Sequence, residues 1–87
     1  MIKLLKTTLF ANDLEYLRKN EPKLWGKVQK LCIDIVEHPF EGLGKPEPLK
    51  YQFGGVWSRR IDRKNRLLYM LTDNDTIKLL SCRGHYE

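Results

Sequence analysis

Residues 41–48, EGLGKPEP, contain two glycines and two prolines and separate two stretches of different hydrophobic spacing. Such a segment favours a loop, because glycine and proline interrupt regular structure. Before it, apolar residues recur at helical intervals, whereas after it branched and aromatic residues form short runs between polar turns. This change of period predicts helices followed by a sheet, which is an α+β fold.

Two helices are expected before the loop. Phe10, Leu14 and Leu17 fall at i, i+4 and i+7 and predict a helix over roughly residues 9–19. The sequence NDLE at 12–15 resembles an N-terminal capping signal.

The second helix is expected to begin at Pro22, since proline is tolerated in a first turn. It should end before His38, because the following Pro39 disfavours helical backbone in the preceding residue. The two helices therefore form a hairpin with one apolar face to bury.

Three strand-like runs follow, at residues 56–62, 66–72 and 76–82. Short polar turns join them, so they are expected to form an antiparallel meander. The apolar run near residue 2 allows a short first strand. We therefore expect one domain over residues 1–87, with a helical hairpin on one face of a small antiparallel sheet and the other face free.

The charge is uneven along the chain, whose formal net charge is +5. Residues 1–44 contain seven Lys and Arg against six Asp and Glu, whereas residues 45–87 contain nine against five. The excess of positive charge in the sheet half indicates a polyanionic partner. Taken alone, the excess is better explained as a general solubilising charge, and it becomes informative only together with other site chemistry.

The opening MIKLLKTTLF is too short, and too interrupted by lysines, for a signal peptide or a membrane span. A cytoplasmic protein that does not enter a membrane is therefore expected. Cys32 and Cys82 are isolated and should be reduced thiols. With His38 and His85 they lack metal-site spacing, so no metal and no other cofactor is predicted.

Several side chains suit chemistry on RNA, namely Lys45, Glu47, Lys50, Arg59, Arg60, Arg66, Arg83, His85 and Tyr86. Taken singly, each has a simpler interpretation. Glu47 can be a solvated loop carboxylate, and Arg59 and Arg60 can be surface charges that prevent edge-to-edge pairing of sheets. His85 and Tyr86 can belong to a frayed terminus. Trp57 and Tyr69 are expected to pack in the core or across strands.

Taken together, a carboxylate, a histidine and several arginines fit acid–base cleavage of RNA. The 2′-hydroxyl must lose a proton and the leaving 5′-oxygen must gain one, which suits groups with near-neutral pKa values. Arginines stabilise the additional negative charge on phosphorus. A tyrosine can stack on a base.

Three stretches of the chain resemble the Txe/YoeB family of bacterial toxins, within the RelE/ParE superfamily. They are HPFEGLGKPEPLK at 38–50, GVWSRRIDRKNRLLYMLTD at 55–73 and SCRGHY at 81–86. The first 37 residues are similar only in helix pattern. The resemblance implies the α+β fold of that superfamily and an endoribonuclease that cuts mRNA on the ribosome. It also implies a paired antitoxin of the YefM/Axe type with an acidic segment.

The resemblance assigns roles residue by residue. It implies that Glu47 is the general base, Arg66 stabilises the transition state, His85 is the general acid and Tyr86 is the catalytic tyrosine. It implies that Lys50 and Arg60 bind phosphate, and Lys45, Arg59 and Arg83 are predicted as further RNA contacts.

Two residues depart from the family pattern. Gly84 stands where a bulky residue is more common, and Glu87 extends a chain that usually stops at the tyrosine. Two alternatives remain from the sequence alone: a non-catalytic ParE-like toxin and a basic RNA-binding module. The sequence also leaves open whether the chain forms a homodimer, and whether Arg66 faces Arg59 or Arg60.

Overall fold

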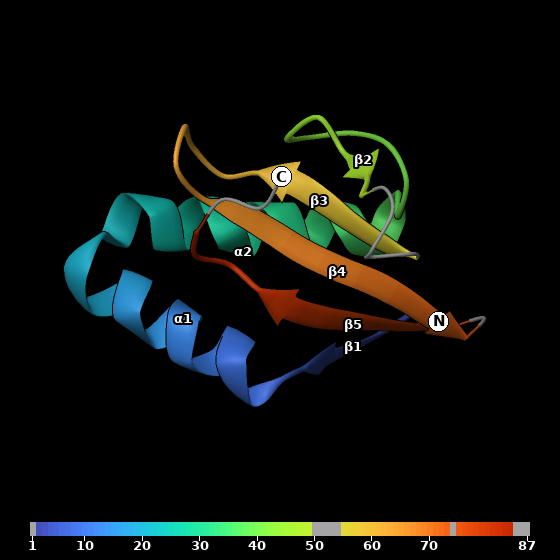
Figure 1. The fold of residues 1–87 in the computed structure, drawn as a ribbon, viewed down its shortest axis with the longest axis horizontal. Helices are drawn as coiled ribbons and strands as arrows, with labels where there is room; N and C mark the ends of the chain where they lie inside the picture. Colours follow the sequence, from blue (N-terminus) through green and yellow to red (C-terminus); the bar gives the residue numbers. More distant parts are fainter. Residues whose placement is uncertain (1, 50–54, 74, 85–87) are drawn as a thin grey trace.

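The computed structural model describes residues 2–49, 55–73 and 75–84. In these residues the chain forms, in order, β1 (Lys3–Lys6), α1 (Thr8–Asn20), α2 (Pro22–Glu37), β2 (Glu47–Pro48), β3 (Val56–Arg60), β4 (Arg66–Asp73) and β5 (Thr76–Ser81). The strands make one sheet in the order β1-β5-β4-β3-β2. The sheet lies across α2, with α1 beside it and β1 and β2 at the two edges (Figure 1). The predicted α+β architecture is confirmed.

The sheet is mixed rather than wholly antiparallel. β3, β4 and β5 form the predicted antiparallel meander, but β1 runs parallel to β5, with Lys3 opposite Thr76. A parallel neighbour requires a crossover connection, which α1, α2 and the remaining strands provide. The loop predicted over 41–48 also ends earlier than expected, because Glu47 and Pro48 pair with β3. Proline is compatible with this position because β2 is an edge strand.

The first helix begins at a different cap from the one that the sequence suggested. The hydroxyl of Thr7 accepts a hydrogen bond from the Phe10 N–H at 3.0 Å and donates to the Leu80 carbonyl at 2.9 Å. Asp13, in the predicted capping signal, lies inside α1 and is buried. Its carboxylate accepts the Cys82 N–H at 3.1 Å, so it joins α1 to the end of β5.

The core lies between the helices and one face of the sheet. Its fully buried members are Phe10, Leu17, Val28, Leu31, Ile35, Ile61, Leu67, Tyr69, Ile77, Leu79 and Cys82. Trp57 is half-buried and packs on Phe40 with ring centroids 4.8 Å apart, so the packing predicted for Trp57 and Tyr69 is confirmed. Neither helix in the described residues has the length and hydropathy that a membrane span requires.

Candidate active site

The strand register brings Glu47, Arg60 and Arg66 onto one face of the sheet. Glu47 lies opposite Ser58 on β3, and Arg60 lies opposite Arg66 on β4. Paired residues point to the same side of a sheet, and so do residues two apart on one strand. This is the face away from the helices, because Arg59, between Ser58 and Arg60, points into the helix side.

The spacing within this group follows from strand geometry. Glu47 and Arg60 are diagonal neighbours, with backbones about 7–8 Å apart. Two strand spacings and two residues separate Glu47 from Arg66, which corresponds to roughly 12 Å between their Cα atoms. Long side chains from both positions can reach one phosphodiester between them.

Arg66 is half-buried and connected to the end of the described chain. Its backbone N–H donates to the Gly84 carbonyl at 2.9 Å, and the Gly84 N–H donates to Asn65 Oδ1 at 3.0 Å. The Arg66 guanidinium donates through Nη1 to the carbonyl oxygens of Asp62 at 2.6 Å and Asn65 at 3.1 Å. Gly84 directly precedes His85 in sequence, and the predicted residues His85 and Tyr86 lie outside the described residues.

The turn before β4 is held by the Asp62 carboxylate. Oδ1 of Asp62 accepts the N–H groups of Lys64 at 2.9 Å and Asn65 at 2.7 Å, as well as the Asn65 side-chain amide. Burial tends to raise the pKa of Asp62, but the hydrogen bonds from Asn65 and Lys64 outweigh it and lower the pKa. The turn therefore supports both Arg66 and Gly84, a role of Asp62 and Asn65 that the sequence pattern did not predict.

Lys45 and Arg60 are both exposed and border the same loop. The Arg60 N–H donates to the Gly44 carbonyl at 2.7 Å, which ties the end of the loop to β3. Lys45 has a positive φ of 50°, so the chain turns sharply before it enters β2. Lys50 lies outside the described residues.

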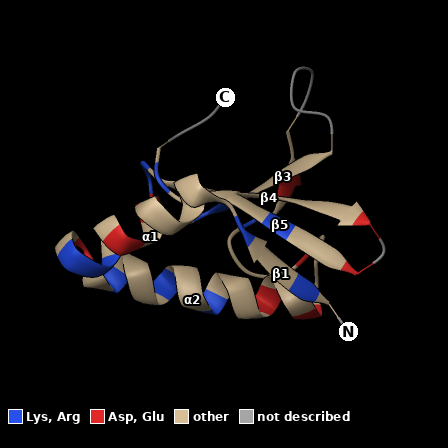
Figure 2. Ribbon diagram, turned by 90° about the horizontal axis from the view of Figure 1, so that it is seen from below, with Lys and Arg blue, Asp and Glu red and all other residues tan. Residues whose placement is uncertain are grey.

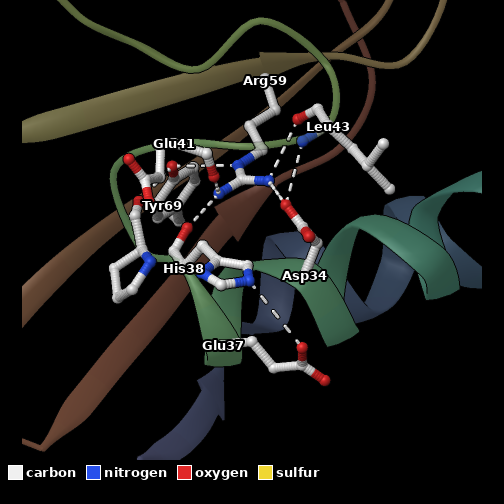
Figure 3. A network of polar contacts seen from close by, with 8 residues as sticks. Asp34, Glu37, His38, Glu41, Leu43, Arg59 and Tyr69 are labelled. Atoms are coloured by element: carbon white, nitrogen blue, oxygen red, sulfur yellow. Dashed lines mark hydrogen bonds and ion pairs between the residues drawn. The ribbon is translucent and has the colours of Figure 1, made fainter.

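The prediction that Arg59 contacts RNA is wrong. Its side chain has 0% exposure and points into the protein, where it pairs with Asp34 of α2 (Figure 3). The registers of β3 and β4 also answer the question that the sequence left open: Arg66 faces Arg60, and Arg59 faces Leu67.

Arg83 is exposed, but its guanidinium packs against α1. Its Cζ lies 3.5 Å from the centroid of the Tyr16 ring, a cation–π contact. The predicted RNA contact of Arg83 stays a prediction, and the contact with Tyr16 is one that the sequence did not suggest.

Basic residues also occur outside the sheet half. Lys23, Lys27 and Lys30 recur at helical spacing along α2, up to the acidic residues at its C-terminal end (Figure 2). The net charge of residues 1–44 conceals these lysines, because the acidic residues of the same half offset them in the sum.

Two serines lie in the same transverse row as Glu47. Ser58 is opposite both Glu47 and Leu68, and Leu68 is opposite Ser81. Both serines are buried, and Ser81 Oγ has no hydrogen-bond partner in the described part of the chain. Alternation along β3 relates Ser58 to the face of Glu47, whereas a register irregularity beside Leu68 and Tyr69 interrupts the alternation along β5 before Ser81.

Comparison with known proteins places this chain in a family. A family profile described as YoeB-like toxin of bacterial type II toxin-antitoxin system matches residues 7–86. The Toxin YoeB of Synechocystis sp. is 41% identical over 86 residues, covering 99% of both chains. A YoeB/ParE toxin from Agrobacterium tumefaciens superposes with a TM-score of 0.94 at 35% identity, covering 98% of this chain and 100% of that one.

Two solved structures from Staphylococcus aureus are also similar. A YoeB dimer has a TM-score of 0.89 at 35% identity, covering 98% of both chains. A YoeB-YefM complex has a TM-score of 0.86 at 34% identity, covering 99% of both chains. The profile match and the identity over nearly the whole chain confirm the resemblance found in the sequence: the chain belongs to the YoeB-like toxins of bacterial type II toxin–antitoxin systems.

Proposed function

We propose that this toxin is a ribosome-dependent endoribonuclease that cleaves mRNA by metal-independent general acid–base chemistry. The observation that supports the proposal most strongly is the sheet face shared by Glu47, Arg60 and Arg66. One carboxylate and two guanidinium groups extend from that face, at backbone spacings from which their long side chains can reach one phosphodiester. The hydrogen bond from the Arg66 N–H to the Gly84 carbonyl holds Gly84, which directly precedes His85 in sequence, beside Arg66.

In the proposed reaction Glu47 accepts the proton of a ribose 2′-hydroxyl. The freed oxygen attacks the adjacent phosphorus, and the bond from phosphorus to the 5′-oxygen breaks. His85 donates a proton to that leaving oxygen. The products are one fragment that ends in a 2′,3′-cyclic phosphate and another that begins with a 5′-hydroxyl.

Negative charge accumulates on the phosphoryl oxygens during this step. Arg66 is proposed to stabilise it, because a guanidinium offers two parallel N–H donors to such oxygens. Arg60, Lys45 and Lys50 are proposed to hold neighbouring phosphates, and Tyr86 to fix the nucleotide. Arg59 is not part of this set because its side chain is buried.

The family also supports a proposal about partners. The complex from Staphylococcus aureus contains YefM beside YoeB, and a YoeB dimer is known from the same species. We expect an antitoxin whose acidic segment folds along the basic surface of this toxin and neutralises it. We also expect the active toxin to engage the ribosome and its mRNA in the cytoplasm.

A reconstituted translation reaction with a defined mRNA tests the proposal. The wild-type toxin should cut the mRNA only when ribosomes are present. Glu47→Gln and His85→Ala should each lower the single-turnover rate by on the order of 10²-fold or more. Glu21→Gln, which changes an exposed carboxylate between the helices, should cut at the wild-type rate. Wild-type rates from both Glu47→Gln and His85→Ala contradict the proposal.

A further inference from the structure

The buried guanidinium of Arg59 uses all of its hydrogen-bond donors. An arginine has five N–H groups. Nε donates to Tyr69 Oη at 3.1 Å, and Nη1 donates to Asp34 Oδ2 at 2.5 Å and to the Leu43 carbonyl at 3.0 Å. Nη2 donates to the carbonyl oxygens of His38 at 2.5 Å and Glu41 at 2.8 Å (Figure 3).

The partners of Arg59 hold further groups of the same loop. Tyr69 Oη donates to the Pro39 carbonyl at 2.7 Å, and Asp34 Oδ2 accepts the Leu43 N–H at 2.9 Å. Five backbone groups of residues 38–43 are thus bonded to three side chains, which come from α2, β3 and β4. These three side chains, Asp34, Arg59 and Tyr69, are called the loop clamp below.

The clamped loop leads directly to Glu47. The Gly44 carbonyl accepts the Arg60 N–H, and only Lys45 and Pro46 then precede Glu47. Proline fixes its own φ angle, so the chain has little freedom between the clamp and β2. Gly44 itself is packed against β3 and α2, because an added Cβ would lie 3.0 Å from both the Arg60 carbonyl oxygen and Leu31 Cδ2.

A buried charge is a costly way to fill space, since apolar residues of similar volume often give equal or greater stability. Here the guanidinium supplies donors to three loop carbonyls, which apolar side chains cannot do. We propose that Arg59 is a positioning residue: through the loop clamp it fixes the backbone path that holds Glu47 on the face of Arg60 and Arg66. This inference rests on the proposed role of Glu47 as general base.

The expected size of the effect follows from the geometry of proton transfer. A general base must lie within about 2.6–3.2 Å of the atom that it deprotonates. A displacement of about 1 Å can lower a rate on the order of 10²-fold. Weakening the clamp should therefore reduce the rate of the chemical step and leave substrate binding by Arg60 largely unchanged.

Three variants weaken the clamp without removing Arg59. Asp34→Asn keeps an acceptor oxygen but removes its charge, and Tyr69→Phe removes the hydroxyl between Arg59 and Pro39. Gly42→Ala acts from the loop, because Gly42 has a φ of +107° and an added Cβ would overlap with Asp34 Oδ2. Val28→Ala is the matched control, since it truncates the core elsewhere on α2 and lowers stability without touching the loop.

The first measurement is single-turnover cleavage of ribosome-bound mRNA, at a temperature where circular dichroism shows every variant to be folded. The clamp variants should lower the maximal rate about tenfold or more, with half-saturating toxin concentrations within about twofold of the wild type. Val28→Ala should keep the wild-type rate. Folded clamp variants that cleave at the rate of Val28→Ala overturn the inference.

The second measurement is a double-mutant cycle with Glu47→Gln. If the clamp acts through Glu47, then adding Asp34→Asn to Glu47→Gln should cause little further loss. Fully additive losses overturn the inference, because they show that the clamp acts on another part of the site.

Hydrogen exchange separates this inference from the proposed function. In Asp34→Asn the amides of residues 43–49 should exchange faster than in the wild type, while those of β4 and β5 should not change. If the exchange rates of these amides in residues 43–49 do not change, the inference that the loop clamp fixes this segment is overturned, even if the toxin cleaves as proposed. If these amides exchange faster in the variant but the wild-type toxin does not cleave RNA, the loop clamp is supported as the anchor of the loop. The proposed function is then rejected.

Discussion

Arg60 and Arg66 lie directly opposite each other on β3 and β4, so two guanidinium groups occupy adjacent positions on the sheet face away from the helices. Like charges directly opposite each other destabilise a sheet. The Arg66 guanidinium donates hydrogen bonds to the carbonyl oxygens of Asp62 and Asn65, which offsets part of this repulsion. An anion bound between the two arginines would offset more of it.

Arg60→Gln should therefore stabilise the folded toxin while weakening its contact with RNA. We expect the free energy of unfolding to rise by on the order of 0.2–1 kcal/mol at low salt. The gain should shrink as salt screens the arginine pair. Urea unfolding at two salt concentrations measures it, and an unfolding free energy that does not rise at low salt contradicts the repulsion described above.

Arg66→Lys should lose much of the cleavage rate and keep most of the affinity for ribosomes. Lysine retains the charge but cannot offer two parallel N–H donors, nor bond the Asp62 and Asn65 carbonyls in the same way. Arg63→Lys, on the exposed part of the same turn, is the matched control and should change neither the cleavage rate nor the affinity for ribosomes. Single-turnover cleavage and ribosome co-sedimentation measure the two effects. Equal rates for both variants would remove Arg66 from the catalytic set.

Stability should fall in acid through Asp34. The hydrogen bond from Arg59, followed by that from the Leu43 N–H, lowers the pKa of Asp34 below its ordinary value of 3.8, and nearby His38 acts in the same direction. The unfolded chain therefore binds this proton at a higher pH than the folded one. The stabilisation is present above pH 3.8 and is lost as the pH falls through the lower, folded pKa.

Urea unfolding of the wild type and Asp34→Asn between about pH 2 and 6 tests this prediction, with the pH window set by the lowered pKa. The wild type should lose stability more steeply below pH 3.8 than the variant, whose residue 34 does not titrate. Asp62 also has a lowered pKa and contributes to both curves, so the difference between them reports on Asp34. Parallel curves would show that Asp34 is not stabilised by Arg59.

Both thiols should resist alkylation in the folded toxin. Burial raises the pKa of Cys82 to about 12, with the Asp13 carboxylate acting in the same direction, and burial raises that of Cys32 to about 11. The thiolate is the reactive form, so little of it is present near neutral pH. Mass spectrometry after iodoacetamide treatment should find modification only in urea. Rapid labelling of Cys82 without urea would show that the end of β5 opens.

Much of the fold follows from sequence pattern, and the exceptions have physical causes. Helical spacing and Pro22 predicted α2, and short polar turns predicted β3 to β5. The direction of β1 depends on its neighbour β5, which no local pattern reveals. The cap at Thr7 was missed in favour of residues 12–15, although its bond from the Phe10 N–H is local; only its second bond, to Leu80 at 73 positions away, depends on the fold.

Among the predicted site residues that the structure describes, the error concerns two adjacent arginines, and the roles of the others stay predictions. Strand alternation requires Arg59 and Arg60 to face opposite sides, but only the register shows which side is buried. The register turns Arg60 toward Arg66 and Arg59 toward Asp34. Burial of a charge depends on partners such as Asp34 and the loop carbonyls, which lie up to 25 positions away in sequence.

The chemical identity of the cut ends tests the central claim most directly. The mRNA is cleaved on ribosomes by the wild-type toxin, and both fragments are analysed by mass spectrometry. Attack by the 2′-hydroxyl predicts a 2′,3′-cyclic phosphate on the upstream fragment and a 5′-hydroxyl on the downstream one, and loss of both products with Glu47→Gln. A 3′-hydroxyl paired with a 5′-phosphate would contradict the account, because those ends require attack by water rather than by the ribose.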